Sequence, residues 1–170
     1  MKNIAIKYGF IGSIVMMLGV MLPFWIYGVE MELGAGEVYG YASMILSLSA
    51  IYFGIQQYKS ELGGELTFKE AFLFGTFVNF IAALAFGLFS FVLYQWIMPD
   101  FLQTYLDYSI QSIQNDANLS QEQIENELKY INEGKDLWLS PAFGGLLMFG
   151  TVFPIGIVMT SVFSFVLKSK

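Results

Sequence analysis

Four long apolar stretches constrain the fold of this chain most strongly. A helix needs about 20 residues to cross a bilayer core of roughly 30 Å. Each stretch meets or nearly meets that length without an interior Asp, Glu, Lys or Arg, and they lie near residues 10–28, 39–58, 71–96 and 140–167. The sequence therefore predicts an all-α fold, a four-transmembrane-helix bundle forming a single integral membrane domain over residues 1–170.

The composition argues against catalysis. The chain contains no histidine, cysteine or arginine. Histidine and cysteine are the usual near-neutral acid–base groups, thiol nucleophiles and zinc or haem ligands, and arginine is the best side chain for clamping phosphate. We therefore expect no enzyme activity, no cofactor and no bound metal. The formal net charge of −6 also argues against nucleic acid as a partner.

Lysines mark one side of the predicted bundle. Six of the eight lysines flank the apolar stretches on that side, and the positive-inside rule places it in the cytoplasm. Both termini are then cytoplasmic and residues 97–139 are external. The first apolar run is longer than the core of a signal peptide, so we expect an uncleaved first span. The six residues are Lys2, Lys7, Lys59, Lys69, Lys168 and Lys170.

The external connection is patterned as two amphipathic helices, at about 100–114 and 120–133. Ser120 and Gln123 resemble a capping box at the start of the second helix. The connection is also acidic, with eight carboxylates against two lysines. A lid on the bundle, a surface for a partner or ligand, and contact with the membrane surface all remain open. The apolar residues at helical spacing are Leu102, Tyr105, Leu106, Ile110, Ile113, Ile124, Leu128 and Ile131.

Local signals define two further features. Gly63 and Gly64 supply the backbone freedom for a tight reversal between spans two and three, and Thr67 with Glu70 matches a capping box that starts span three. Pro154 lies in the middle of span four, where it removes a backbone hydrogen bond and is expected to bend the helix.

Small and polar residues recur every four positions in span three. They are expected to line one face that allows close helix approach, with an asparagine able to hydrogen-bond across the contact. Span two offers a plausible matching face. Helix packing and a polar pathway through the membrane are both compatible with this pattern. The span-three residues are Gly75, Asn79, Ala83 and Gly87, and those of span two are Ser43, Ser47, Ala50 and Gly54.

Glu37, at the start of span two, is the residue that comes nearest to being an ionisable group within the membrane. A carboxylate is favourable at a helix N-terminus, and Tyr41 follows one turn later on the same face. Glu37 is therefore expected either to stabilise the end of the helix or to contact a ligand or cation.

Four segments of the chain resemble one known family, the domain of unknown function forty-one ninety-nine. They are residues 36–44, the turn at 62–71, Pro99-Asp100-Phe101 and Pro154-Ile155-Gly156, and the resemblance covers nearly the whole chain in order. It implies a four-span bacterial membrane protein with an external helical connection, in the inner membrane of a Gram-negative bacterium. It implies no catalytic residues.

Two functional hypotheses follow. The first is a non-enzymatic membrane protein whose acidic external hairpin, residues 98–138, engages a membrane or envelope partner. The second is a small transporter or channel subunit that forms a homo-oligomer, with Glu37, Asn79 and the serines of span two along its pathway. An accessory sensor of lipid or envelope state shares the external hairpin with the first hypothesis. In each case the lipid bilayer is a direct partner.

Overall fold

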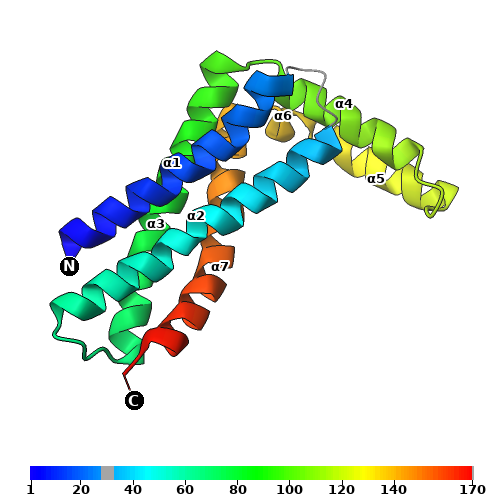
Figure 1. The fold of residues 1–170 in the computed structure, drawn as a ribbon. Coiled ribbons are helices and arrows are strands. Elements are labelled where there is room, and N and C mark those ends of the chain that lie inside the picture. Colours follow the sequence, from blue (N-terminus) through cyan, green and yellow to red (C-terminus); the bar gives the residue numbers. More distant parts are fainter. Residues whose placement is uncertain (28–32, 170) are drawn as a thin grey trace. The chain divides into compact units, whose positions relative to one another are not determined.

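The chain folds almost entirely into helices. A computed structural model describes residues 1–27 and 33–169, without the side chains of Phe24, Tyr27 and residues 33–37. The structure is 87% helix, and no strand occurs in those ranges. This confirms the all-α prediction. The elements, seen in Figure 1, are α1 (Lys2–Tyr27), α2 (Leu33–Glu61), α3 (Phe68–Val92), the π-helical turn η2 (Leu93–Ile97), α4 (Phe101–Gln114), α5 (Gln121–Glu133), α6 (Lys135–Trp138) and α7 (Pro141–Leu167).

Four of these helices are long and apolar enough to cross a membrane. They correspond to the four apolar stretches, and each contains most of the stretch predicted from the sequence. Their presence indicates a multi-pass membrane protein. The apolar segments run over Lys2–Pro23, Val38–Glu61, Phe68–Ile97 and Pro141–Leu167.

The helices are grouped in two compact units. The first unit contains residues Met1–Gly87 and Met148–Lys170, and the second contains Leu88–Leu147. Helices α3 and α7 therefore contribute to both. In the first unit the core is built from large side chains that are almost fully buried, among them Met16, Leu48, Ile51, Ile55, Phe74 and Val78.

Helices α1 and α2 lie side by side and antiparallel in the first unit (Figure 1). Small residues bring the two backbones together. A Cβ at Gly12 would lie 3.2 Å from the carbonyl oxygen of Ser47, and a Cβ at Gly54 would lie 3.3 Å from the Tyr8 ring. The buried Ser47 hydroxyl donates to the Gly12 carbonyl at 2.6 Å. Glycine and serine thus allow a close, hydrogen-bonded helix contact.

The polar face of α2 contacts α1 rather than matching the small-residue face of α3. Gly75 of α3 instead faces Ile51 and Ile55 of α2, whose side-chain atoms lie 3.2 and 3.0 Å from the position of a Cβ at Gly75. The expectation that the small-residue faces of α2 and α3 pack against each other is therefore wrong. A glycine leaves a hollow, and a branched side chain of the neighbouring helix fills it.

The turn between α2 and α3 has the geometry that its sequence indicates. Gly63 and Gly64 have φ values of +77° and +95°, which side chains rarely tolerate. The Glu70 amide donates to Thr67 Oγ1 at 3.3 Å, and the Thr67 amide donates to Glu70 Oε2 at 3.0 Å. These two bonds form the capping box that begins α3.

The segment after α7 is tied to this same turn. The Ser169 amide donates to the Leu66 carbonyl at 2.8 Å, and the Leu66 amide donates to Ser169 Oγ at 2.9 Å. The Ser169 hydroxyl also donates to the Gly64 carbonyl at 3.0 Å, and Lys59 Nζ donates to the Leu167 carbonyl at 2.8 Å. The end of α7 is therefore fixed to the α2–α3 turn by four hydrogen bonds.

In the second unit, the π-helical turn orients Tyr94. The Met98 amide donates to the Leu93 carbonyl at 2.7 Å. Tyr94 is buried and stacks on Phe101 of α4, with ring centroids 5.4 Å apart. A Cβ at Gly144 would lie 2.8 Å from Tyr94 Cδ2, so the ring is also held against the first turn of α7.

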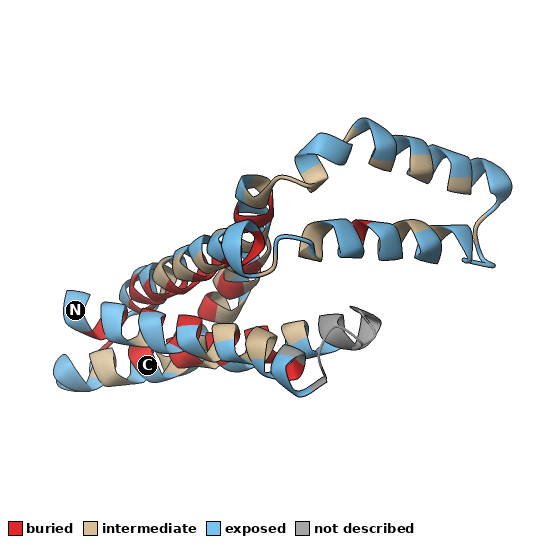
Figure 2. Cartoon of the chain, turned by 90° about the horizontal axis from the view of Figure 1, so that it is seen from above, coloured by how far each residue is buried: buried red, intermediate tan, exposed pale blue. Residues whose placement is uncertain are grey.

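Helices α4 and α5 run antiparallel in the second unit (Figure 2). Figure 2 shows partly buried residues recurring along both helices, between exposed ones. The Gln123 amide donates to Ser120 Oγ at 3.3 Å and the Ser120 amide donates to Gln123 Oε1 at 2.9 Å, which forms the capping box of α5. Of the eight apolar residues expected on the stripe, Tyr105 is exposed, which corrects that part of the pattern. The other seven are buried or half-buried: Leu102, Leu106, Ile110 and Ile113 of α4 and Ile124, Leu128 and Ile131 of α5.

Candidate functional site

The most unusual side chain of the first unit is Asn79, which is fully buried in the middle of apolar α3. Gly75, Ala83 and Gly87, which together with Asn79 recur every four residues on the same helix, are buried as well. Residues spaced four apart lie on one face of a helix. Asn79 is thus the polar member of a face made of small residues.

Asn79 is held against α7 by a hydrogen bond. Its Nδ2 donates to the carbonyl oxygen of Phe153 at 2.8 Å. Pro154, which follows Phe153, lies inside α7, and the bend expected there stays a prediction.

Gly156 makes room for the Asn79 amide. A Cβ at Gly156 would overlap the amide group, with Nδ2 only 2.6 Å away. One turn along, a Cβ at Gly75 would lie 2.7 Å from Thr160 Cγ2. The segment from Gly75 to Asn79 therefore faces the segment from Thr160 back to Gly156, at a separation that only glycines permit.

Four buried oxygen atoms of these two helices have no hydrogen-bond partner among the described residues. Native proteins leave few buried polar atoms unpaired, so each such atom needs an explanation. The atoms are Thr76 Oγ1 and Asn79 Oδ1 of α3 and Thr160 Oγ1 and Ser164 Oγ of α7. We call the region that carries them the α3–α7 interface. The contacts between the two helices are made by Gly75 and Asn79 of α3 and by Phe153, Gly156 and Thr160 of α7. Thr76 and Ser164 are included by their position in the sequence, because Thr76 follows Gly75 and Ser164 comes one helical turn after Thr160.

The polar residues singled out in the sequence occupy different surroundings. No hydrogen bond links Asn79 to Ser43 or Ser47 within the described part of the chain, because the Ser47 hydroxyl donates to Gly12 and the Ser43 hydroxyl donates to the Gly40 carbonyl at 2.8 Å. Tyr41 is 57% exposed. The side chain of Glu37 lies outside the described residues. The described contacts therefore do not connect all five positions into a single pathway.

Sequence reasoning missed the α7 side of the interface. Gly156, Thr160 and Ser164 recur every four residues, as do Gly75, Asn79 and Ala83 on α3. The spacing was therefore available as a signal. It was obscured because Ser161 and several branched residues share the same stretch, and because a hydroxyl in a membrane helix usually bonds to its own backbone. Ser161 does so, donating to the Ile157 carbonyl at 2.9 Å.

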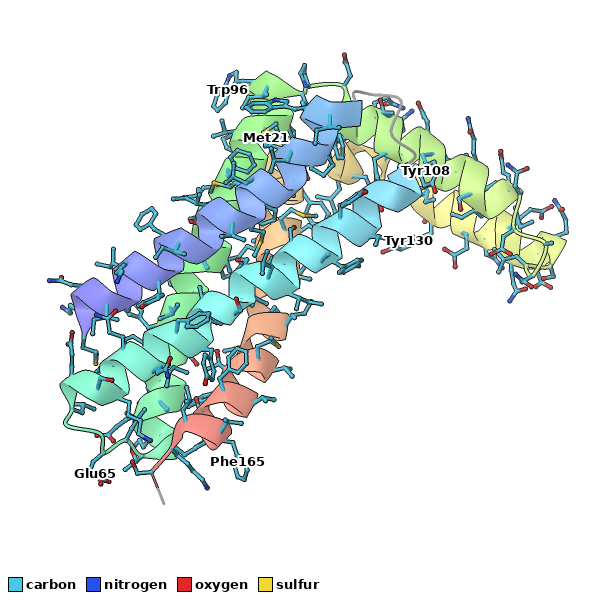
Figure 3. The ribbon with its side chains drawn as sticks, in the orientation of Figure 1. Met21, Glu65, Trp96, Tyr108, Tyr130 and Phe165 are labelled. Atoms are coloured by element: carbon cyan, nitrogen blue, oxygen red, sulfur yellow. The ribbon has the colours of Figure 1, made fainter. Side chains whose placement is uncertain are left out.

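Acidic side chains are concentrated elsewhere, on the second unit. All eight carboxylates of residues 98–138 are exposed, as are both lysines. Among the residues that the structure describes, no three carboxylate, histidine or cysteine side chains come close enough together to hold a metal ion. Figure 3 shows Tyr108 on α4, Tyr130 on α5 and Trp96 in the π-helical turn η2. The side chain of Trp96 is 66% exposed.

Comparison with known proteins identifies the family. A family model described as "Protein of unknown function (DUF4199)" matches residues 7–169. No curated protein and no solved structure matches the chain. The family match spans all four apolar helices, the α2–α3 turn and the α4–α5 region, in agreement with the resemblance seen in the sequence. The chain therefore belongs to this family of proteins of unknown function, DUF4199.

Proposed function

We propose that this protein is a non-enzymatic protein of the bacterial inner membrane that engages a membrane or envelope partner through α4 and α5. In this proposal both termini are cytoplasmic and residues 98–138 form an external amphipathic hairpin. The lysine distribution supports the orientation, because six lysines flank the spans on the side of the termini. The lack of histidine and cysteine supports a role other than catalysis.

The single observation that carries the proposal is the exposure of the acidic side chains on α4 and α5. Eight carboxylates and two lysines are exposed over residues 98–138, which leaves this segment with a large negative charge. The only ion pair recorded there, Lys129 with Glu133 at 3.9 Å, is an exposed pair within one helix. Such pairs contribute little to stability. The charge is therefore available to attract a basic partner.

Hydrogen bonds within α4 and α5 reach two of these carboxylates without neutralising them. Gln103 Nε2 donates to Asp107 Oδ1 at 2.8 Å, and Gln121 Nε2 donates to Glu125 Oε1 at 3.3 Å. Neutral amide donors hold the carboxylates in place while leaving their charge intact. A partner surface rich in lysine or arginine would match this arrangement.

Crosslinking in native membranes, followed by affinity purification and mass spectrometry, tests the proposal. The variant Glu122→Gln with Glu125→Gln removes two charges from α5. The matched control, Glu61→Gln with Glu65→Gln, removes two charges near the α2–α3 turn, where Glu65 is labelled in Figure 3. We expect the first pair to lose a crosslinked partner that the second pair retains.

A deletion provides a second test of the same proposal. Replacing residues 102–136 with a short linker should abolish the partner while the chain still inserts in the membrane. A partner set that is identical for wild type, both charge variants and the deletion would contradict the proposal.

A second candidate function is a subunit of a small oligomeric transporter or channel. The observation that favours it is the run of unpaired oxygens along the α3–α7 interface, in a segment long enough to cross the membrane. Asn79→Leu should then abolish a flux measured with the wild type in proteoliposomes. If the wild-type flux survives the substitution, Asn79 is not on the pathway.

A further inference from the structure

The orientation of the Asn79 amide is set by its neighbour on α7. The amide group has one accepting oxygen and one donating nitrogen. Because the Phe153 carbonyl can only accept, the nitrogen must face it, and the 2.8 Å bond has this arrangement. Turning the amide round would place two oxygens against each other. Asn79 Oδ1 is thus fixed on the side of Gly156, where it must receive a proton donor.

No described group of the protein donates to Asn79 Oδ1. Donors nevertheless occur nearby, because three hydroxyls of the same interface are also unpaired. Thr76 precedes Asn79 by three residues on α3, a spacing at which side chains start about 5–6 Å apart. Thr160 lies opposite Gly75, one helical turn from Asn79. Both residues therefore lie within about one helical turn of Asn79, and both hydroxyls are buried and unpaired among the described residues.

Side chains that start one helical turn apart can place their oxygens at the separation that one water molecule bridges. Two oxygens that each lie about 2.8 Å from the same water are up to about 5–6 Å apart. Water can donate two hydrogen bonds and accept others, so it satisfies both the accepting Oδ1 and the hydroxyls. Buried waters in proteins typically occupy such positions, between polar atoms that are otherwise unpaired.

The close packing of the interface excludes larger occupants. A Cβ at Gly156 would already overlap the amide, and a Cβ at Gly75 would lie 2.7 Å from Thr160 Cγ2. Lipid chains have no proton to donate, and Asn79 and Thr160 have no exposed surface at which lipid headgroups could reach them. The group that donates a hydrogen bond to Asn79 Oδ1 must therefore be small, polar and enclosed by the protein.

We propose that the α3–α7 interface holds buried water that bridges Asn79 Oδ1 to the hydroxyls of Thr76 and Thr160. This inference does not depend on the function proposed for the acidic surface of α4 and α5. The bridging water completes the hydrogen bonding of the interface inside the apolar part of the first unit. Ser164, one turn beyond Thr160, extends the same line of hydroxyls.

Water contacts detected by NMR test the proposal. The full chain is labelled with ¹⁵N-asparagine and purified in detergent with deuterated tails. Cross-relaxation between the Asn79 side-chain amide protons and water is then measured, with the signal assigned from its absence in Asn79→Ala. We expect a cross-peak of the sign given by a long-lived water, although Asn79 is fully buried.

Threonine-to-valine variants, which remove a hydroxyl and keep the shape of the side chain, locate the water. Thr76→Val combined with Thr160→Val should remove the cross-peak while the amide signal remains. The control Ser47→Ala removes a buried hydroxyl that already donates to Gly12, and it should leave the cross-peak unchanged. Absence of the cross-peak in the wild type, or its persistence in the double valine variant, would overturn the proposal.

Discussion

Replacing Gly156 with alanine should destabilise the protein through a clash with Asn79. The new methyl group would occupy the position of the Asn79 amide, and Asn79 is too deeply buried to turn toward solvent. Overpacking of a tight interface costs about 1–3 kcal/mol. Displacing the amide also breaks its bond to Phe153, and interhelical bonds of this kind average about 0.6 kcal/mol.

The helix itself would benefit from the alanine. Replacing glycine by alanine inside a helix stabilises it by about 0.5–1 kcal/mol. The net loss in the free energy of unfolding for Gly156→Ala is therefore about 1–3 kcal/mol. In an Asn79→Ala background the clash is absent, so the same substitution should be neutral or stabilising by up to about 1 kcal/mol. The double-mutant cycle should thus give a coupling of about 1–4 kcal/mol.

Reversible unfolding in mixed detergent micelles measures all four free energies. The control is Gly150→Ala in the same helix, because no atom lies within 4 Å of a Cβ at that position. It should be neutral or slightly stabilising in both backgrounds. If Gly156→Ala lowered the free energy of unfolding by the same amount with and without the Asn79 side chain, the close approach of α3 and α7 would be refuted.

Two further predictions concern the α2–α3 turn. Gly63→Val and Gly64→Val should each lower the free energy of unfolding by about 1–2 kcal/mol, because side chains are disfavoured at positive φ; unchanged melting temperatures would argue against this turn. Ser169→Ala removes the partner of the Leu66 amide and should cost about 0.5–1.5 kcal/mol. Hydrogen exchange at Leu66 should accelerate in that variant, and exchange at the wild-type rate would mean that Ser169 does not hold the turn.

The features that were predictable from the sequence depend on composition or on neighbouring residues. Apolar length alone identified the four spans, since a bilayer requires it. The capping boxes of α3 and α5 and the reversal at Gly63 and Gly64 involve residues within a few positions of one another, so local patterns were sufficient.

The features that were missed depend on contacts between distant helices. Asn79 could be recognised as an interhelical donor, but its acceptor on α7 could not be named, because any helix presents many carbonyls. The partner of the serine face of α2 was misjudged for a related reason. Small residues indicate that a neighbour comes close, and they do not indicate which neighbour. Ser47 contacts α1, whereas α3 meets α2 at Ile51 and Ile55.

The bond between Asn79 and Phe153 also bears on the order in which the chain is made. The two residues are 74 positions apart, and ribosomes add about 5–20 residues per second. Asn79 is therefore synthesised about 4–15 s before its acceptor. Until α7 arrives, an early form of the protein carries an unsatisfied amide within an apolar helix. A chain that terminates before α7 carries it permanently, which makes entry of the last helix the step that completes assembly.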